Sequence, residues 1–205
     1  MDEKKLEILE RASAVYMKFG IKSVTMDDLA RELSISKKTI YKYFNDKNDL
    51  VKSIIELKVQ MDSALSINKS LQAENAIEEL IQISELVTKQ FRDINPIVFS
   101  DLKKFHPDAW QVIEEHKKNF VLKLITENIE RGIKEKVYRE NLTPAITAKL
   151  YVSASDAAMN PEIFTWPEFK FQEVFLEMIR LQINGMANDA GRTFLKQKLK
   201  STKYV

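Results

Sequence analysis

Apolar side chains recur at intervals of three and four along the first part of the chain. Gly20 follows at the point where a glycine ends many helices. The pattern therefore predicts a first helix over residues 3–19. Its apolar positions are Leu6, Leu9, Ala12, Val15, Tyr16 and Phe19.

Two short helices are predicted next, separated by a break of three residues. Thr25 and Asp28 have the spacing of a capping box, with aspartate in place of the usual glutamate. Ser36 can cap the helix that follows the break, which we expect over 37–44. A helix, a short break and a second short helix outline a helix-turn-helix.

Longer helical periods fill the rest of the chain, and breaks fall where proline and asparagine gather. The predicted fold class is therefore all-α, with a small N-terminal three-helix domain over 1–46 and a larger helical domain over 47–205. The helices expected after the first three span 46–65, 73–92, 97–105, 107–135, 144–159, 167–187 and 190–200.

Composition supports a folded helical protein. Hydrophobic residues make up 44% and charged residues 30% of the 205, with only Gly 4 and Pro 5. The absence of cysteine excludes disulfides, thiolate metal sites and cysteine catalysis, and favours a reducing compartment. No apolar run approaches the ~18 residues of a membrane span. We therefore expect a cytoplasmic protein without a membrane partner.

The net charge of +2 is too small to indicate nucleic-acid binding, so the position of the charges matters. Between Ser34 and Asp46 the chain is basic, without an acid. At ~100° per residue, Ile40 and Phe44 share one stripe of the third helix, while Lys38 and Lys42 lie almost opposite. The apolar stripe can pack on the second helix, and the cationic side can enter a major groove. The alternative is that the lysines form an ordinary solvated face.

The runs "ILERASAVYMKFG" and "VTMDDLARELSISKKTIYKYFNDKNDL" resemble the DNA-binding domain of the TetR family of transcriptional regulators, over most of residues 5–50. Two positions depart from that pattern, because Ser34 and Lys38 stand where the family often has glycine or another small residue. The matching positions are Ile8, Ala12, Gly20, Thr25, Met26, Asp28, Leu29, Ala30, Ile35, Ser36, Lys37, Thr39, Tyr41, Phe44, Lys47 and Leu50.

The resemblance implies that the partner is a double-stranded DNA operator. It also implies which residues lie at or near that DNA. These are Thr25, Ser36, Lys37, Thr39, Tyr41, Lys42, Tyr43 and Lys47. Helix geometry adds Lys38. We expect phosphate contacts from Thr25, Thr39, Tyr41 and Lys47, and base contacts from Lys37, Lys38, Lys42 and Tyr43.

For the larger region, the resemblance implies an all-helical domain that forms a homodimer and often binds a small effector. Two apolar faces on the helix over 167–187 and several alanines on the helix before it independently suggest an intersubunit bundle. The alternative is that both helices are core of a monomer. The predicted interface residues are Ala154, Ala157, Ala158, Leu176, Ile179 and Ile183.

Aromatic and methionine side chains beyond residue 50 are candidates to line a pocket for an apolar ligand. Ordinary core packing is the alternative for each of them. The candidates are Met61, Phe91, Phe99, Trp110, Phe120, Tyr151 and Phe175.

The predicted function is a DNA-binding transcription regulator, most simply a homodimeric repressor released from a near-palindromic operator by a small apolar or amphipathic ligand. A regulator that needs no ligand or answers to a protein partner is one alternative. A helical-domain enzyme is less favoured, because the sequence has no Gly-rich phosphate loop and no identifiable Ser/His/Asp arrangement. His106 and His116 lack a Glu-x-x-His pattern. We therefore expect no catalytic residue, metal or cofactor.

Overall fold

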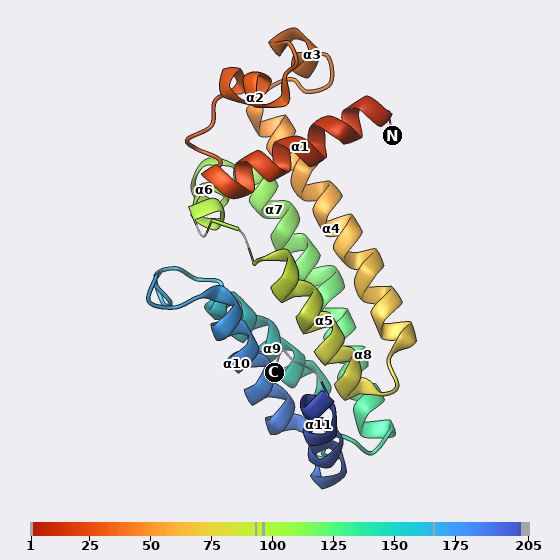
Figure 1. The fold of residues 1–205 in the computed structure, drawn as a ribbon. Helices are drawn as coiled ribbons and strands as arrows, with labels where there is room; N and C mark the ends of the chain where they lie inside the picture. The colour runs from red at the N-terminus through yellow and green to blue at the C-terminus, as the bar shows by residue number, and fades with distance from the viewer. Residues whose placement is uncertain (1, 93, 96, 166, 202–205) are drawn as a thin grey trace. The chain divides into compact units, whose positions relative to one another are not determined.

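The computed structural model describes residues 2–92, 94–95, 97–165 and 167–201 (Figure 1). Within these ranges the regular secondary structure is helical, apart from one isolated bridge between Tyr138 and Ala187. The prediction of an all-α fold is confirmed. The chain divides into two compact units, which interleave along the sequence.

Unit 1 comprises Met1–Asp62 and Asp93–His116. It holds α1 (Glu3–Phe19), α2 (Met26–Leu33), α3 (Lys37–Tyr41), the first part of α4 (Lys47–Gln72), α6 (Ile97–Phe105) and α7 (Pro107–His116). Val98, Leu102 and Ala109 from α6 and α7 are buried in the same core as the apolar faces of α1 to α4. This unit therefore does not end at residue 46, where the sequence suggested a domain boundary, because α6 and α7 complete its core.

Local signals explain how the helices of unit 1 begin. Thr25 accepts a hydrogen bond from the Asp28 amide at 3.1 Å, and Asp28 accepts one from the Thr25 amide at 3.1 Å. The capping box is therefore present as predicted. Asp46 caps α4 in the same way, since its carboxylate accepts from the Asp49 amide at 2.8 Å.

The turn between α2 and α3 contains a residue in the left-handed region. Ser34 has φ 56° and ψ 39°, and its amide donates to the carbonyls of Ala30 and Arg31 at the end of α2. A side chain in this conformation costs roughly 1–2 kcal/mol relative to glycine. The turn forms without a glycine, at the energetic cost of that strain.

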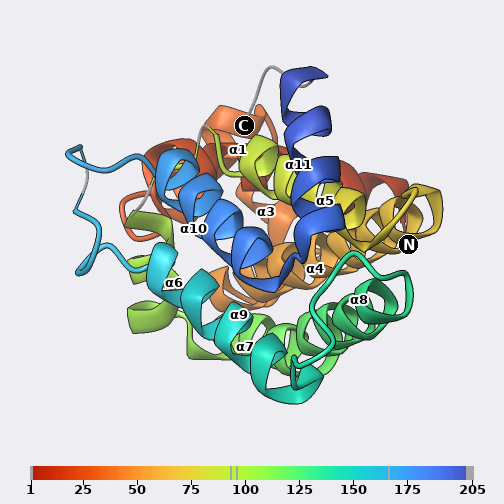
Figure 2. The same ribbon diagram turned by 90° about the horizontal axis from the view of Figure 1, so that it is seen from below.

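Unit 2 comprises Ser63–Arg92 and Lys117–Val205. It holds the rest of α4, α5 (Ala76–Gln90), a π-helical turn η1 (Lys117–Val121), α8 (Leu122–Lys134), α9 (Pro144–Ala158), α10 (Phe171–Met186) and α11 (Asp189–Ser201). Helices α5, α8, α9 and α10 pack each against the next, and α10 closes the ring on α5 (Figure 2). Their inner faces bury one apolar core.

Several helix boundaries differ from the sequence-based ranges. The single helix expected over 107–135 is divided into α7 and α8 by η1, a π-helical turn that is wider than an α-helical one. Helix α4 continues to Gln72 rather than 65, and α10 begins at Phe171 rather than 167. Helix α5 begins later than expected because Asn75 caps it, accepting from the Ile77 and Glu78 amides.

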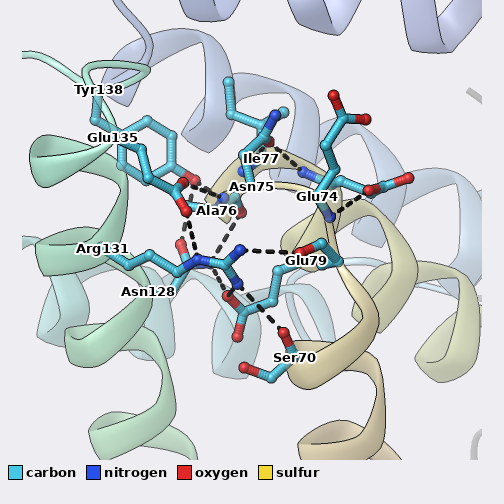
Figure 3. A network of polar contacts seen from close by, with 12 residues as sticks. Ser70, Glu74, Asn75, Ala76, Ile77, Glu79, Asn128, Arg131, Glu135 and Tyr138 are labelled. Atoms are coloured by element: carbon cyan, nitrogen blue, oxygen red, sulfur yellow. Dashed lines mark hydrogen bonds and ion pairs between the residues drawn. The ribbon is translucent and has the colours of Figure 1, made fainter.

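A buried polar network connects α5 to α8 within unit 2 (Figure 3). The Asn128 side chain donates to the Ala76 carbonyl at 2.8 Å and to Glu79 at 2.9 Å. The Tyr138 hydroxyl donates to Asn128 at 3.1 Å, and burial raises the pKa of that hydroxyl well above its usual value. Buried polar groups are costly unless paired, so these contacts fix how the two helices meet.

Arg131 extends the network to the C-terminal end of α4. Its guanidinium donates to the carbonyls of Ser70 at 3.2 Å and Ala73 at 2.9 Å, and it pairs with Glu79 at 3.3 Å and Glu135 at 2.6 Å. A cation at this place satisfies carbonyls that have no partner within the helix. Glu79 is only 2% exposed, so Arg131 compensates a carboxylate that water does not reach.

We predict that Arg131→Met lowers the free energy of unfolding by about 2–4 kcal/mol, because Glu79 loses its cation and two carbonyls lose their donor. Urea unfolding at one fixed protein concentration measures this change. Lys123→Met is the matched control, since its pair with Glu127 is 74% and 60% exposed. It should change stability by less than about 0.5 kcal/mol. An equal loss in both variants would contradict a special role for Arg131.

We also predict that Ser34→Gly raises the free energy of unfolding by about 0.5–1 kcal/mol. Relief of the left-handed strain exceeds the entropy that glycine adds to the unfolded chain. Ser53→Gly, within α4, should have the opposite sign and cost about 0.5 kcal/mol. Thermal unfolding followed by circular dichroism compares the two variants. Destabilisation by Ser34→Gly would show that the Ser34 side chain itself supports the turn.

Candidate nucleic-acid interface

Helix α3 is anchored by two large apolar side chains. Ile40 is 0% and Phe44 is 1% exposed, and both lie in one core with Leu29 and Leu33 of α2. Ile35, in the connecting turn, is half-buried against the same core. The predicted packing of α3 on α2 is therefore present, and it fixes which residues of α3 face outward.

The N-terminus of α3 is held by Ser36, as predicted. Its side chain accepts from the Thr39 amide at 3.0 Å, and the two hydroxyls are 2.7 Å apart. The helix ends earlier than the expected residue 44, because α3 stops at Tyr41 and the chain turns through Lys42 and Tyr43. The outward basic residues therefore come from one short helix and the turn that follows it.

Three exposed lysines stand on the outward side of this element. Lys37 pairs with Asp27 of α2 at 2.9 Å, and its ammonium lies 6.0 Å from the centroid of the Tyr41 ring. Lys42 lies 5.3 Å from the centroid of the Tyr43 ring. Among the residues that the structure describes, no acid lies within 4.0 Å of Lys38 or Lys42. These two cations are available to an anionic partner.

Thr25, predicted to contact a phosphate, lies exposed at the N-cap of α2. Its hydroxyl donates to Asp28 at 2.6 Å, and hydrogen bonds from Thr25 hold the pKa of the Asp28 carboxyl below its usual value. The Thr25 side chain is therefore already engaged in capping the N-terminus of α2. The amides of the first turn of α2 are the groups here that suit an incoming phosphate.

Lys47 points inward. Its ammonium donates to the carbonyl of Ile21 at 2.6 Å and lies 5.8 Å from the centroid of the Tyr16 ring. Burial lowers the pKa of this lysine, and nearby Asp101 opposes that shift. The predicted phosphate contact would have to use the remaining N–H groups of this partly buried ammonium.

Further polar contacts inside unit 1 connect α6, and the residue between α6 and α7, to the turn before α2 and to the start of α4. The buried carboxylate of Asp101 accepts from the Lys22 amide at 2.8 Å. The ring of His106 meets the Asn48 side chain at 2.7 Å, and burial lowers the pKa of that histidine. Sequence reasoning missed Asp101 and Asp27, because each finds its partner only through the tertiary fold.

The seven pocket candidates do not come from one unit. Met61, Phe99 and Trp110 belong to unit 1, and Met61 is 49% exposed. In unit 2, Tyr151 and Phe175 are buried in the core. The remaining two, Phe91 and Phe120, are half-buried members of unit 2.

An aromatic chain runs through unit 2 near these candidates. The rings of Phe91 and Phe171 have centroids 5.0 Å apart, and those of Phe171 and Phe175 are 5.3 Å apart. Burial raises the pKa of the Tyr151 hydroxyl. Phe175 and Tyr151 are therefore members of the apolar core of unit 2, and their role in a ligand pocket stays a prediction.

The predicted dimer residues require a correction. Ile179 and Ile183 are 3% and 1% exposed and lie in the core of unit 2. They share that inner face with Phe175 and Met186, so the expectation that they face a partner is wrong. Ala158 is buried as well. Leu176, Ala154 and Ala157 are half-buried.

A different stripe on the same two helices is exposed. Ile146 and Leu150 on α9 are 59% and 61% exposed, and Leu181 on α10 is 66% exposed. By helical periodicity, Ala154 and Ala157 lie on the same side of α9 as Ile146 and Leu150. Ala154 and Ala157 are thus the predicted interface residues that share a side of α9 with these exposed side chains.

Within the described ranges, no three His, Asp or Glu side chains gather as they would around a metal ion. Helices of the length and hydropathy needed to cross a membrane are likewise absent from the described part of the chain.

Comparison with known proteins agrees with this geometry. Residues 8–54 match the family described as "Bacterial regulatory proteins, tetR family". YvaF and YhgD of Bacillus subtilis (strain 168), both named uncharacterized HTH-type transcriptional regulators, are 28% and 29% identical to the chain. The YvaF match covers 82% of this chain and 87% of YvaF, and the YhgD match covers 75% and 82%.

Solved structures share the fold at low identity. A putative transcriptional regulator from Saccharomonospora viridis in complex with choline is 18% identical with a TM-score of 0.76, covering 92% of this chain and 100% of that one. A TetR-family regulator from Agrobacterium tumefaciens is 16% identical with a TM-score of 0.73, covering 90% and 98%. The fatty acid degradation regulator FadR from Bacillus halodurans is 18% identical with a TM-score of 0.71, and the match covers 89% of this chain and 95% of that one. The chain therefore belongs to the TetR family of DNA-binding transcriptional regulators.

Proposed function

We propose that this regulator reads a near-palindromic operator with α3 and acts as a homodimeric repressor that a small apolar or amphipathic ligand releases. The observation that carries the DNA-reading part is the rigid anchoring of α3 by Ile40 and Phe44 beneath an exposed basic side. A rigid helix with cations outward suits the major groove, because docking then costs little ordering of the protein. The compartment of action is the one that holds the DNA, the cytoplasm.

The contacts that each residue makes within the protein suggest which part of the DNA it contacts. Lys38 and Lys42 have no acid beside them within the described residues, so both are candidates for base edges or phosphates. We assign the contacts to the DNA sugar–phosphate backbone to Thr39, Tyr41 and the first turn of α2. Lys47 joins them with the N–H groups that it does not donate to the Ile21 carbonyl.

The homodimer is supported by the exposed stripe on α9 and α10. Three large apolar side chains, Ile146, Leu150 and Leu181, are each more than half exposed. Gly185 on α10 has open space around it, which allows a close approach by another backbone. A two-fold dimer places two copies of α3 on half-sites about one or more helical turns apart.

Ligand control is supported by proteins of the same fold and by the contacts that connect α6 and His106 to the chain on either side of α2 and α3, the two helices that form the DNA-reading region. One solved relative was determined with choline, another is named a ketosteroid transcriptional regulator, and a third is named a fatty acid degradation regulator. In this chain, Asp101 and His106 connect α6 and α7 to Lys22 and Asn48. A ligand that displaces α6 lowers DNA affinity by the same factor by which DNA lowers ligand affinity.

Selection of bound sequences from a random duplex pool tests the proposal. The expected result is a near-palindrome that is bound tightly, with an affinity that falls steeply as salt rises. Enrichment of no sequence by a demonstrably folded protein would contradict sequence-specific reading by α3. The selected operator then serves as the probe for release by candidate ligands such as fatty acids, sterols and choline.

We predict that Lys42→Ala weakens operator binding by about 1–3 kcal/mol and relaxes the preference at one position of each half-site. Competition with operators that differ at single base pairs measures both effects. A loss of the same size on every sequence, with a reduced salt dependence, would instead make Lys42 a phosphate contact.

We predict that Leu150→Glu weakens dimerisation by roughly 100-fold or more, because a charge would have to be buried in an apolar interface. Sedimentation velocity over a concentration series measures the monomer–dimer equilibrium. Leu71→Glu is the matched control, since Leu71 of α4 is 81% exposed and lies outside the α9–α10 stripe. A Leu150→Glu protein that remains as dimeric as the control would contradict this interface.

A further inference from the structure

An acidic residue lies beside the first residue of α3. The carboxylate oxygens of Asp27 approach the ammonium of Lys37 at 2.9 and 3.1 Å, so both oxygens share one cation. Asp27 takes no part in the capping box of α2, which uses Thr25 and Asp28. Its carboxylate therefore forms an ion pair that joins α2 to Lys37 of α3.

This pairing distinguishes Lys37 from its neighbours. Lys38 and Lys42 have no acid within 4.0 Å among the described residues, although all three lysines are exposed. The hydrogen bond that Lys37 donates to the Asp27 carboxylate raises the pKa of Lys37, so the ammonium stays charged. Lys37 thus keeps its donors while its charge is balanced locally.

A charge-balanced ammonium treats the two parts of DNA differently. A phosphate is repelled by the Asp27 carboxylate about as much as it is attracted by Lys37, so the pair contributes little to backbone binding. A guanine edge is neutral and offers O6 and N7 as acceptors, so a remaining N–H of Lys37 can still donate there. Backbone contacts occur on every sequence, whereas base-edge contacts depend on the sequence.

We propose that Asp27 is a specificity-determining residue, which withholds Lys37 from phosphates on any DNA and reserves it for a base edge of the operator. The inference rests on the proposed reading of DNA by α3. Asp27 therefore acts in the opposite sense to the exposed lysines. The lysines raise the affinity for any DNA, whereas Asp27 lowers the affinity for sequences other than the operator.

The decisive variant is Asp27→Asn, measured on a duplex of random sequence over a series of salt concentrations. Freed Lys37 should then bind phosphate, raising the affinity near 0.1 M salt by roughly three- to tenfold and steepening the log–log salt slope by about 0.9. Adding Lys37→Gln to Asp27→Asn should abolish both changes. Circular dichroism melting establishes that the variants are folded.

Glu32→Gln supplies the matched control, because Glu32 is an exposed acid of the same helix and, among the described residues, forms no ion pair with α3. It changes the net charge equally but should leave the salt slope unchanged. Equal behaviour of Asp27→Asn and Glu32→Gln would overturn the proposal. So would a gain that persists after Lys37→Gln.

The same variants measured on the selected operator test the specificity role. The ratio of operator affinity to random-sequence affinity should fall severalfold in Asp27→Asn. A rise of both affinities by one common factor would overturn that role. If the wild-type protein selects no operator, the proposed function fails, while the random-sequence measurement still decides whether Asp27 withholds Lys37.

Discussion

The burial of Ile40 and Phe44 is the constraint on which the helix-turn-helix of α2 and α3 depends. Helix α3 is only five residues long, and a helix of that length has no stability of its own in water. It exists because those two side chains are fully enclosed by the core of unit 1. Once they are inside, the helical period turns Lys38 outward, and Lys42 is exposed in the turn that follows the helix.

Much of this helix-turn-helix could be predicted from the sequence because its signals are local. The capping box at Thr25, the cap at Ser36 and the stripe formed by Ile40 and Phe44 each involve residues within four positions of one another. The pairing of Asp27 with Lys37 spans ten residues, and that of Asp101 with Lys22 spans 79. No periodicity or cap rule connects such partners, so only the tertiary structure could show them.

Unit 2 shows where periodicity fails. Both sides of α10 are apolar, and the sequence could not tell which side the protein itself would bury. The structure encloses Ile179 and Ile183 and leaves Leu181 exposed, because α5 and α9 cover one side of the helix. The network around Asn128 and Arg131 was likewise invisible, since it uses carbonyls whose positions depend on where α4 ends.

The core of unit 1 is assembled from two separated stretches of chain. Residues between Ile8 and Ile55 meet Val98, Leu102 and Ala109 in a single cluster, with the α5 segment intervening in the sequence. During synthesis the N-terminal stretch leaves the ribosome first, but its core stays incomplete until about half of the chain has emerged. The helix-turn-helix therefore acquires its complete core only midway through translation, although its own residues are synthesised first.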